Sequence, residues 1–468
     1  MSRTGRSTTA CVALLAAAAL VAAAPAAAAP PEFTPGSDGL GDPYFPLAGN
    51  GGYDVRHYSL DLDYVRAGNQ LDAVARIRAK ATQDLSSFNL DLRGFEISEL
   101  AVDGRDAAFS RDGQELTVVP QHGLRRNSAF NVRIEYAGTP ERVIDPDGSS
   151  EGWVPTADGA FVVNEPQGSP GWFPANDNPQ DKATYDFSVT VPEGITAIGN
   201  GVLKSSRTSD GKTTWNWSED SPMASYLTTV TNGVFELRTS SWRGRPLYHA
   251  VDPTIAAKDL AFERLALEPR VLDFFSDLYG PYPFSSGGGV VDIGGVFYAL
   301  ESQTKSMYDA INNVPSEGTV VHEISHQWFG NAVTLAVWPD IWLNEGFARW
   351  SQWIWTERGG GATAQQQFQT LYDTRPASFW TRPPANLGGP RFLFADQGYT
   401  RGGMTLQALR EKIGDDAFFA ILRTWYEENK YGDVTTADFI ALSERISGQQ
   451  LDEFFDIWLY RPVKPTVW

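Results

Sequence analysis

Residues His322 to Trp350 read HEISHQWFGNAVTLAVWPDIWLNEGFARW. The beginning of this stretch lies in a predicted helix at 316–329. Residues four apart on a helix share one face, so His322 and His326 can direct both imidazoles at one metal ion. Glu323 would then lie beside the ion. The sequence therefore predicts a metal-binding helix.

A third ligand is expected from a second predicted helix at 343–357, which carries Glu345. A catalytic zinc site takes three protein ligands and keeps one position open for water. We therefore expect His322, His326 and Glu345 to hold one Zn²⁺ per chain. A zinc ion in such a site lowers the pKa of water and polarises a carbonyl group.

Glu323 follows the first histidine and is predicted to be the general base. A carboxylate beside the metal can take a proton from the attacking water and pass it to the leaving amine. The alternative is a chance His-Glu-x-x-His on an ordinary helix. Because the chain contains only five histidines, that coincidence is rare.

The run 322–350 resembles the zinc signature of the gluzincin metallo-aminopeptidases of the aminopeptidase N type. This resemblance implies a zinc-dependent hydrolase of N-terminal peptide bonds. The form ALESQT at 299–304 resembles that of smaller bacterial members, here a secreted type. The chain stops soon after Phe454–Tyr460, a segment similar to the end of the family's catalytic domain. The large C-terminal helical domain of many members is therefore expected to be absent.

A second resemblance concerns the segment Tyr298-Ala299-Leu300-Glu301-Ser302, which stands where the family carries Gly-x-Met-Glu-Asn. It implies that Glu301 anchors the substrate's ammonium group and that Ala299 contacts the substrate. Tyr298 and Ser302 depart from the family's glycine and asparagine. The backbone contacts and the first side-chain pocket are therefore expected to differ.

A second ammonium anchor is predicted at Glu165, within Asn164-Glu165-Pro166. The interval to the run WFPAND at 172–177 is similar to the family's spacing between a glutamate or glutamine and its Phe-Pro-Cys-x-Asp run. Ala175 replaces the cysteine. The alternative for Glu165 is a solvated surface acid or a surface ion pair.

Tyr399 is the expected donor to the oxyanion of the tetrahedral intermediate. The run GYTRGGM at 398–404 is similar to the family's Tyr-x-Lys-Gly segment, whose tyrosine has this role. Arg401 replaces the lysine, which keeps the charge but changes the geometry. With seventeen tyrosines in the chain, a structural tyrosine is the alternative.

The N-terminus predicts a secretory signal peptide at 1–29, with Arg3 and Arg6 before an apolar, alanine-rich stretch. Cys11, the only cysteine, falls within it, so we expect a secreted protein without disulfides. The net charge of −19 argues against nucleic acid and anionic membranes as partners. The expected protein is a monomer without stable membrane association that acts on peptides with a free N-terminus.

The remaining chain is long enough for two domains. Residues 30–52 are rich in proline and glycine and predict an extended lead-in. Short alternating runs with Asp-Gly and Asn-Gly turns predict an all-β domain at 53–243, similar to the family's saddle-like sandwich. Predicted helices dominate 244–468, among them one at 256–279 and one at 436–447. This part resembles a thermolysin-like catalytic domain with a small sheet that carries Glu301 on its edge strand. Its tryptophans between residues 328 and 355 are expected to pack in the core rather than to form a ligand cage.

The expected function is that of a secreted zinc-dependent aminopeptidase. A thermolysin-like zinc endopeptidase is one alternative, but Glu301 and Glu165 would oppose a peptide that continues upstream of the scissile bond. A non-catalytic peptide-binding protein is the other. A complete set of zinc ligands, general base and oxyanion donor argues against it.

Overall fold

The computed structural model describes residues 1–2, 4–7 and 32–466. The chain divides into two units, Met1–Glu32 and Phe33–Trp468, and the fold below is that of the second. Nearly all of the predicted signal peptide, including Cys11, lies outside the described residues. Among the described helices, none combines the length and apolar character needed to cross a membrane.

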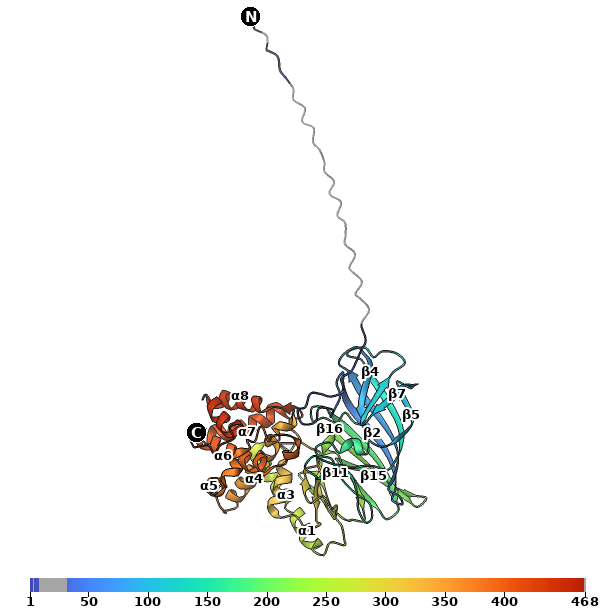
Figure 1. Ribbon diagram of the computed structural model, residues 1–468, viewed down its shortest axis with the longest axis vertical. Coiled ribbons are helices and arrows are strands. Elements are labelled where there is room, and N and C mark those ends of the chain that lie inside the picture. The colour runs from blue at the N-terminus through green and yellow to red at the C-terminus, as the bar shows by residue number, and fades with distance from the viewer. Residues whose placement is uncertain (3, 8–31, 467–468) are drawn as a thin grey trace. The chain divides into compact units, whose positions relative to one another are not determined.

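An eight-stranded sheet dominates the first part of the second unit (Figure 1). The short alternating runs make one face of each strand apolar. Along β2, for example, Leu60 and Leu62 are buried while Asp61 faces outward. The strand order is β15 (Val202–Ser209), β16 (Lys212–Ala224), β13 (Lys182–Pro192), β2 (Tyr53–Val65), β3 (Gln70–Ala81), β9 (Ala129–Gly138), β5 (Glu96–Val102) and β6 (Arg105–Asp106).

Two smaller sheets complete this β-rich region. One has the order β10 (Arg142–Ile144), β11 (Ser150–Pro155), β12 (Ala160–Val163), β17 (Val230–Gly233) and β14 (Thr196–Gly199). The other has the order β1 (Thr34–Pro35), β4 (Leu85–Asp91), β8 (Glu115–Val119) and β7 (Ala108–Asp112). Strand β12 matters most for the site, because the chain reaches Glu165 directly after it.

A further five-stranded sheet precedes the zinc helix, as predicted. Its order is β18 (Glu236–Trp242), β19 (Arg245–Val251), β20 (Gly287–Asp292), β22 (Ser306–Asp309) and β21 (Ala299–Leu300). Strand β21 lies at the edge and Glu301 follows it at once. Because the boundary after residue 243 falls within the hairpin of β18 and β19, we propose that the catalytic part begins before β18.

Helices make up most of the chain that follows, and they gather on one side of the second unit in Figure 1. The fold class is therefore confirmed: a β-rich domain precedes a mainly helical one. The helices are α1 (Lys258–Leu265), α2 (Glu268–Tyr279), α3 (Glu317–Ser325), α4 (Trp342–Arg358), α5 (Ala364–Thr374), α6 (Gly402–Ile413), α7 (Asp415–Asn429), α8 (Thr436–Ser447) and α9 (Asp452–Phe455). A two-stranded sheet of β23 (Thr334–Leu335) and β24 (Asp433–Val434) links α3 to the C-terminal helices.

One predicted helix was wrong in its extent. The single helix expected at 256–279 is two helices, α1 and α2, that meet at Ala266 and Leu267. The reason is Pro269, the second residue of α2. Proline has no backbone N–H and its ring disturbs the preceding turn, so it is tolerated at the start of a helix and not within one.

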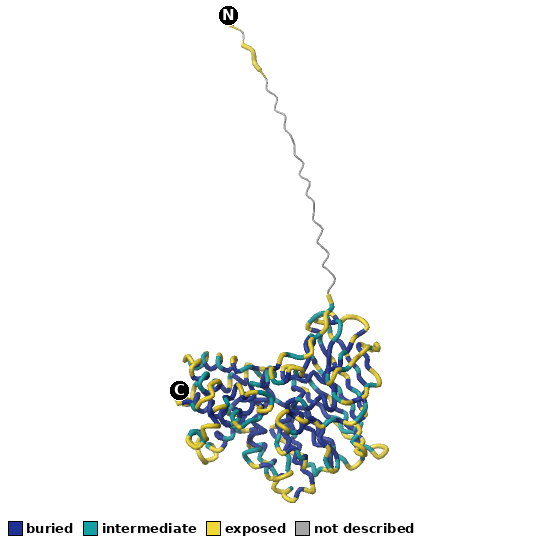
Figure 2. The backbone as a smooth tube through the Cα atoms, in the orientation of Figure 1, coloured by how far each residue is buried: buried dark blue, intermediate teal, exposed yellow. Residues whose placement is uncertain are grey.

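The two regions share a continuous apolar interior, and Figure 2 shows buried backbone in both. One core cluster joins strand residues to Leu335, Trp338 and Ile341 of the catalytic part. The lead-in at 30–52 contributes to this junction, because a carboxylate oxygen of Asp42 accepts a 2.7 Å hydrogen bond from Trp338 N. The six tryptophans between residues 328 and 355 are all buried, which confirms that they belong to the core.

Candidate metal centre and active site

Helix α3 supplies two of the predicted zinc ligands and the predicted base. Its N-cap is Ser316, whose hydroxyl accepts a hydrogen bond from Thr319 N. The helix ends at Ser325, earlier than predicted, but His326 keeps helical dihedral angles as its C-cap. The histidines therefore remain one turn apart, with ring centroids 4.8 Å from each other.

The chain then reverses and enters α4, which carries Glu345. Gly330 makes this reversal possible, because its φ of +129° is rarely adopted by other residues. A Cβ atom there would also lie only 3.1 Å from His326 Nδ1. Asp340 holds the start of α4 in place by accepting hydrogen bonds from the backbone and hydroxyl of Thr436.

The three predicted zinc ligands converge on one point. His322 Nε2 lies 3.0 Å from Glu345 Oε2, and His326 Nε2 lies 3.5 Å from the same oxygen. His326 Nδ1 donates to the carbonyl of Phe329 at 3.0 Å, which directs Nε2 toward the cluster. This Nε2 has no hydrogen-bond partner among the described residues.

The chemistry of these donors fits a zinc ion. Two imidazoles and one carboxylate, all buried, are a common catalytic zinc set. Burial lowers the pKa of His322 to about 4, so its imidazole is neutral and able to ligate. Burial opposes the charge of His326, but Glu301 and Glu345 outweigh that effect and raise its pKa to about 10. A zinc dication bound by these residues would replace the proton of the His326 imidazole.

The two predicted ammonium anchors lie together although they are far apart in the chain. Glu165, Glu301 and Glu345 each offer a carboxylate oxygen, and these oxygens lie within 4.8 Å of one another. One oxygen of Glu165 and one of Glu301 are buried without a hydrogen-bond partner among the described residues. Burial raises the pKa of both carboxyl groups, so a cation is needed to stabilise them in the charged form.

Glu323 lines one cavity together with the zinc ligands and the two ammonium anchors. It belongs to a group with Glu301 and His326 whose ligand atoms lie within 4.8 Å of one another. Burial raises the pKa of Glu323 well above its usual range. A raised pKa suits a carboxylate that accepts and releases a proton near neutral pH.

Tyr399 also lines the cavity, and its ring stacks against that of His322 with centroids 6.0 Å apart. It lies in a π-helical turn, Gln397–Arg401, directly before α6. Arg401 points away from the site: it is fully buried and donates to the carbonyl groups of Trp458, Trp380, Ile457 and Arg461. Arg401 therefore anchors the turn that presents Tyr399.

Sequence reasoning missed two residues that hold Glu301. The side-chain amides of Gln327 and Asn331 donate to the carbonyl oxygen of Glu301 at 3.1 and 2.7 Å. Gln327 also accepts from Thr304 N at 2.9 Å. Both follow the zinc histidines within the quoted run, and that proximity was the only available signal. They join the Glu301 loop to the zinc segment.

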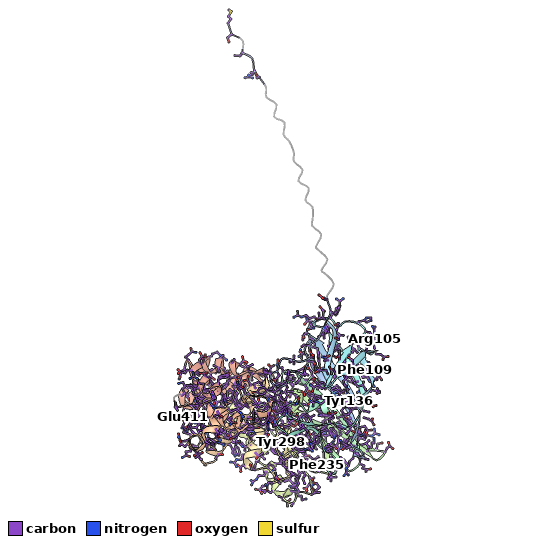
Figure 3. All side chains as sticks on the ribbon, viewed as in Figure 1. Arg105, Phe109, Tyr136, Phe235, Tyr298 and Glu411 are labelled. Atoms are coloured by element: carbon purple, nitrogen blue, oxygen red, sulfur yellow. The ribbon has the colours of Figure 1, made fainter. Side chains whose placement is uncertain are left out.

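The cavity has a volume of about 360 Å³ and opens at the junction of the two regions. Ala299, the predicted substrate contact, lines it together with Tyr298 and Thr319. Figure 3 shows Tyr298 between the strands and the helices. Its hydroxyl donates to Ser150 O at 2.8 Å, so the residue that replaces the family's glycine closes one wall against β11.

Comparison with protein families gives two matches that together cover most of the chain. Residues 55–227 match the peptidase M1 N-terminal domain, and residues 296–458 match the peptidase family M1 domain. The chain belongs to peptidase family M1. The M1 domain match contains both zinc helices, Glu301 and Tyr399.

Individual relatives agree with this assignment. The chain is 25% identical to glutamyl aminopeptidase of Rattus norvegicus, over 88% of this chain and 47% of that protein. It is 26% identical to aminopeptidase N of Lactococcus lactis, over 63% of this chain and 38% of that protein. The chain thus spans about half or less of the length of these curated relatives.

A solved structure matches almost from end to end. It is that of a mutant M1 zinc metallopeptidase from Deinococcus radiodurans bound to a Tyr-Ser-Ala substrate. The match has a TM-score of 0.81 and 28% identity and covers 92% of this chain and 99% of that one. Both the β-rich region and the helical region of the M1 fold are therefore present here.

Proposed function

We propose that this M1 family member is a zinc-dependent aminopeptidase that removes the N-terminal residue of peptides. The observation that carries the proposal is the pair of buried carboxylates, Glu165 and Glu301, beside the zinc ligands. Each keeps an oxygen without a hydrogen-bond partner among the described residues. A substrate ammonium group would satisfy both oxygens, whereas a neutral amide within a chain would leave them uncompensated.

Each residue then has a defined role in hydrolysis. His322, His326 and Glu345 would hold a zinc ion, which polarises a carbonyl group and acidifies water when bound. Glu323 takes the proton from the attacking water and delivers it to the leaving amine. The Tyr399 hydroxyl donates to the developing oxyanion.

The position of the ammonium anchors also sets the register of the substrate. Glu301 is fixed to the zinc segment through Gln327 and Asn331. An ammonium group held there places the first carbonyl, and no later one, beside Glu323 and Tyr399. This selection of the first peptide bond distinguishes an aminopeptidase from an endopeptidase of similar catalytic fold.

The test is Glu301→Ala, assayed on a free aminoacyl substrate and on its N-acetylated counterpart. The wild-type protein should hydrolyse the free-amine substrate and barely the blocked one. Glu301→Ala should raise KM and lower kcat for the free amine, and Glu165→Ala should act in the same direction more weakly. Glu427→Ala, an exposed glutamate on α7, is the matched control and should behave as wild type.

Two results would decide against the proposal. Equal cleavage of free and blocked peptides by wild type, with Glu301→Ala indistinguishable from it, would indicate a thermolysin-like endopeptidase. Binding of peptides without any turnover by the zinc-loaded protein would indicate a non-catalytic peptide-binding protein.

The proposal extends to location and assembly. Arg3 and Arg6 followed by an apolar stretch support secretion after cleavage near Ala29. One chain supplies the three zinc ligands, the base and both ammonium anchors, so the proposed site needs no second subunit and the protein is expected to act as a monomer. N-terminal sequencing of the exported protein and analytical ultracentrifugation test these two points.

A further inference from the structure

Helix α4 presents a second functional group on the face that carries Glu345. Arg349 follows Glu345 by four residues, so the two side chains lie one turn apart on the same side of the helix. The turn advances by about 6 Å. Arg349 therefore stands beyond the zinc ligand along the wall that α4 contributes to the site.

Arg349 is half-buried, yet it has no carboxylate partner among the described residues. Its NH1 donates to Gln352 Oε1 at 2.9 Å, and its Nε is buried without a partner among those residues. Arg375 and Arg410, in contrast, each form a 2.8 Å ion pair, with Asp396 and Asp415. Arg349 therefore keeps a buried donor, Nε, that no described acceptor occupies.

The stem and head of Arg349 are held in place by neighbouring elements. A Cβ atom at Gly403 of α6 would lie 3.0 Å from Arg349 Cγ, so the stem packs against a position that only glycine fits easily. Gln352, which accepts from Arg349, also donates to Gly318 O on α3 at 2.7 Å. This support pre-organises the guanidinium beside the first turn of the zinc helix.

Helix α3 shows that Arg349 lies at the end of the site opposite the ammonium anchors. Glu301 is 3.8 Å from His326. His322 lies one turn back along α3, and Thr319 one turn further, where Gly318 meets Gln352. From His326 to Thr319 the helix rises about 10 Å. An extended tripeptide has a similar length, roughly 10 Å.

Arg349 also lines a surface groove that is separate from the zinc cavity. It has a volume of about 390 Å³ and is lined by Arg349, Thr400 and side chains of α5. Thr400 follows Tyr399, which lines the zinc cavity. The other charged groups in the groove, Arg375 and Asp396, neutralise each other. Arg349 therefore supplies the net charge of the groove.

We propose that Arg349 binds a carboxylate on the leaving side of the substrate, so that the enzyme favours short peptides that place a carboxylate about three residues from the ammonium group. This inference rests on the proposed aminopeptidase function. A guanidinium recognises a carboxylate through two parallel N–H donors. The carboxylate can be the C-terminus of a tripeptide or an acidic side chain at the third position.

The experiment compares Leu-Gly-Gly, Leu-Gly-Gly-amide and Leu-Gly-Asp-amide as substrates of wild type, Arg349→Gln and Arg349→Lys. The measurement is the kcat/KM of each acidic peptide relative to Leu-Gly-Gly-amide within the same protein. Wild type should favour at least one acidic peptide on the order of ten-fold, the usual effect of a charge-assisted hydrogen bond. Arg349→Gln should abolish this preference, and Arg349→Lys should retain part of it.

The two acidic peptides distinguish the sources, because the free acid reports a C-terminal carboxylate and the aspartate peptide reports a side chain. Arg358→Gln, an exposed arginine on the same helix, is the control and should keep the wild-type preference. Isothermal titration of the peptides into Glu323→Gln should show the same ratios in Kd without turnover.

A wild-type ratio near one for both acidic peptides would overturn the proposal, as would a preference that survives in Arg349→Gln. These results differ from a failure of the aminopeptidase proposal itself. In that case the wild-type protein would release no leucine from Leu-Gly-Gly-amide or from the acidic peptides.

Discussion

The two ends of the active site are built in different ways. The zinc end comes from α3 and α4, which are neighbours in sequence, and the spacing of its two histidines is set by one helix. The ammonium end combines Glu165, which follows β12, with Glu301, which follows β21. Those strands belong to different sheets, so this end exists only when the β-rich region and the catalytic region are packed together.

We therefore expect that metal binding and the positioning of the substrate's N-terminus can be altered separately in this protein. Helical geometry alone keeps the histidines together, whereas Glu301 depends on the bonds from Gln327 and Asn331. Substitutions at the zinc end should therefore abolish chemistry or metal binding. Substitutions at the ammonium end should leave zinc bound and weaken positioning.

The largest expected effect is that of Glu345→Ala at the zinc end. Removal of one of three ligands should release the metal and with it all activity, because two imidazoles alone bind zinc weakly. Zinc content measured by mass spectrometry, together with the melting temperature, checks this result. Glu357→Ala on the same helix should keep its zinc. Wild-type zinc affinity in Glu345→Ala would mean that another residue is the third ligand.

Glu323→Gln should leave about one zinc per chain and reduce kcat by roughly 10³-fold, because the proton shuttle is lost while the ligands remain. Parallel zinc analysis and steady-state kinetics on an aminoacyl anilide measure both quantities. Loss of zinc together with activity would show that Glu323 has a structural role and would weaken the separation of the two ends.

Tyr399→Phe should lower kcat on the order of 10²-fold with little change in KM, because the hydroxyl acts on the oxyanion and not on the ground state. Tyr426→Phe is the control, since it also removes a hydroxyl that donates to a carbonyl, but on α7 away from the cavity. An effect confined to KM would instead make Tyr399 a substrate-positioning residue.

The smallest effect is expected for Gln327→Ala. This variant tests whether the two ends act separately, because Gln327 follows the zinc ligand His326 and donates to the Glu301 carbonyl. Loss of its hydrogen bond to the Glu301 carbonyl should cost about 1 kcal/mol and raise KM for free-amine substrates several-fold. Zinc content should stay at the wild-type level. Gln327→Glu, which keeps the acceptor for Thr304 N but not the donor, should recover little. A variant that loses zinc would place Gln327 at the metal end.

Much of the fold could be predicted because it depends on local patterns. Alternation of apolar residues located the strands, as in β2, and the range predicted for α8 was correct. The break between α1 and α2 was missed because the sequence alone did not show whether Pro269 begins a second helix or lies within a longer one. The three-dimensional structure shows that the first helix ends before Ala266 and the second begins after Leu267.

From the sequence alone, His322 and His326 could be predicted as metal ligands and Glu323 as the base, because their spacing on one helix follows from backbone geometry. Only the tertiary structure decided which distant groups face that helix. It brought Glu165 close to Glu301 and surrounded Arg401 with carbonyl groups. It also left Arg349 beside a groove with no carboxylate partner among the described residues. The physical reason is that helical spacing is a property of a few neighbouring residues, whereas the partners of a buried charge depend on how whole sheets and helices pack.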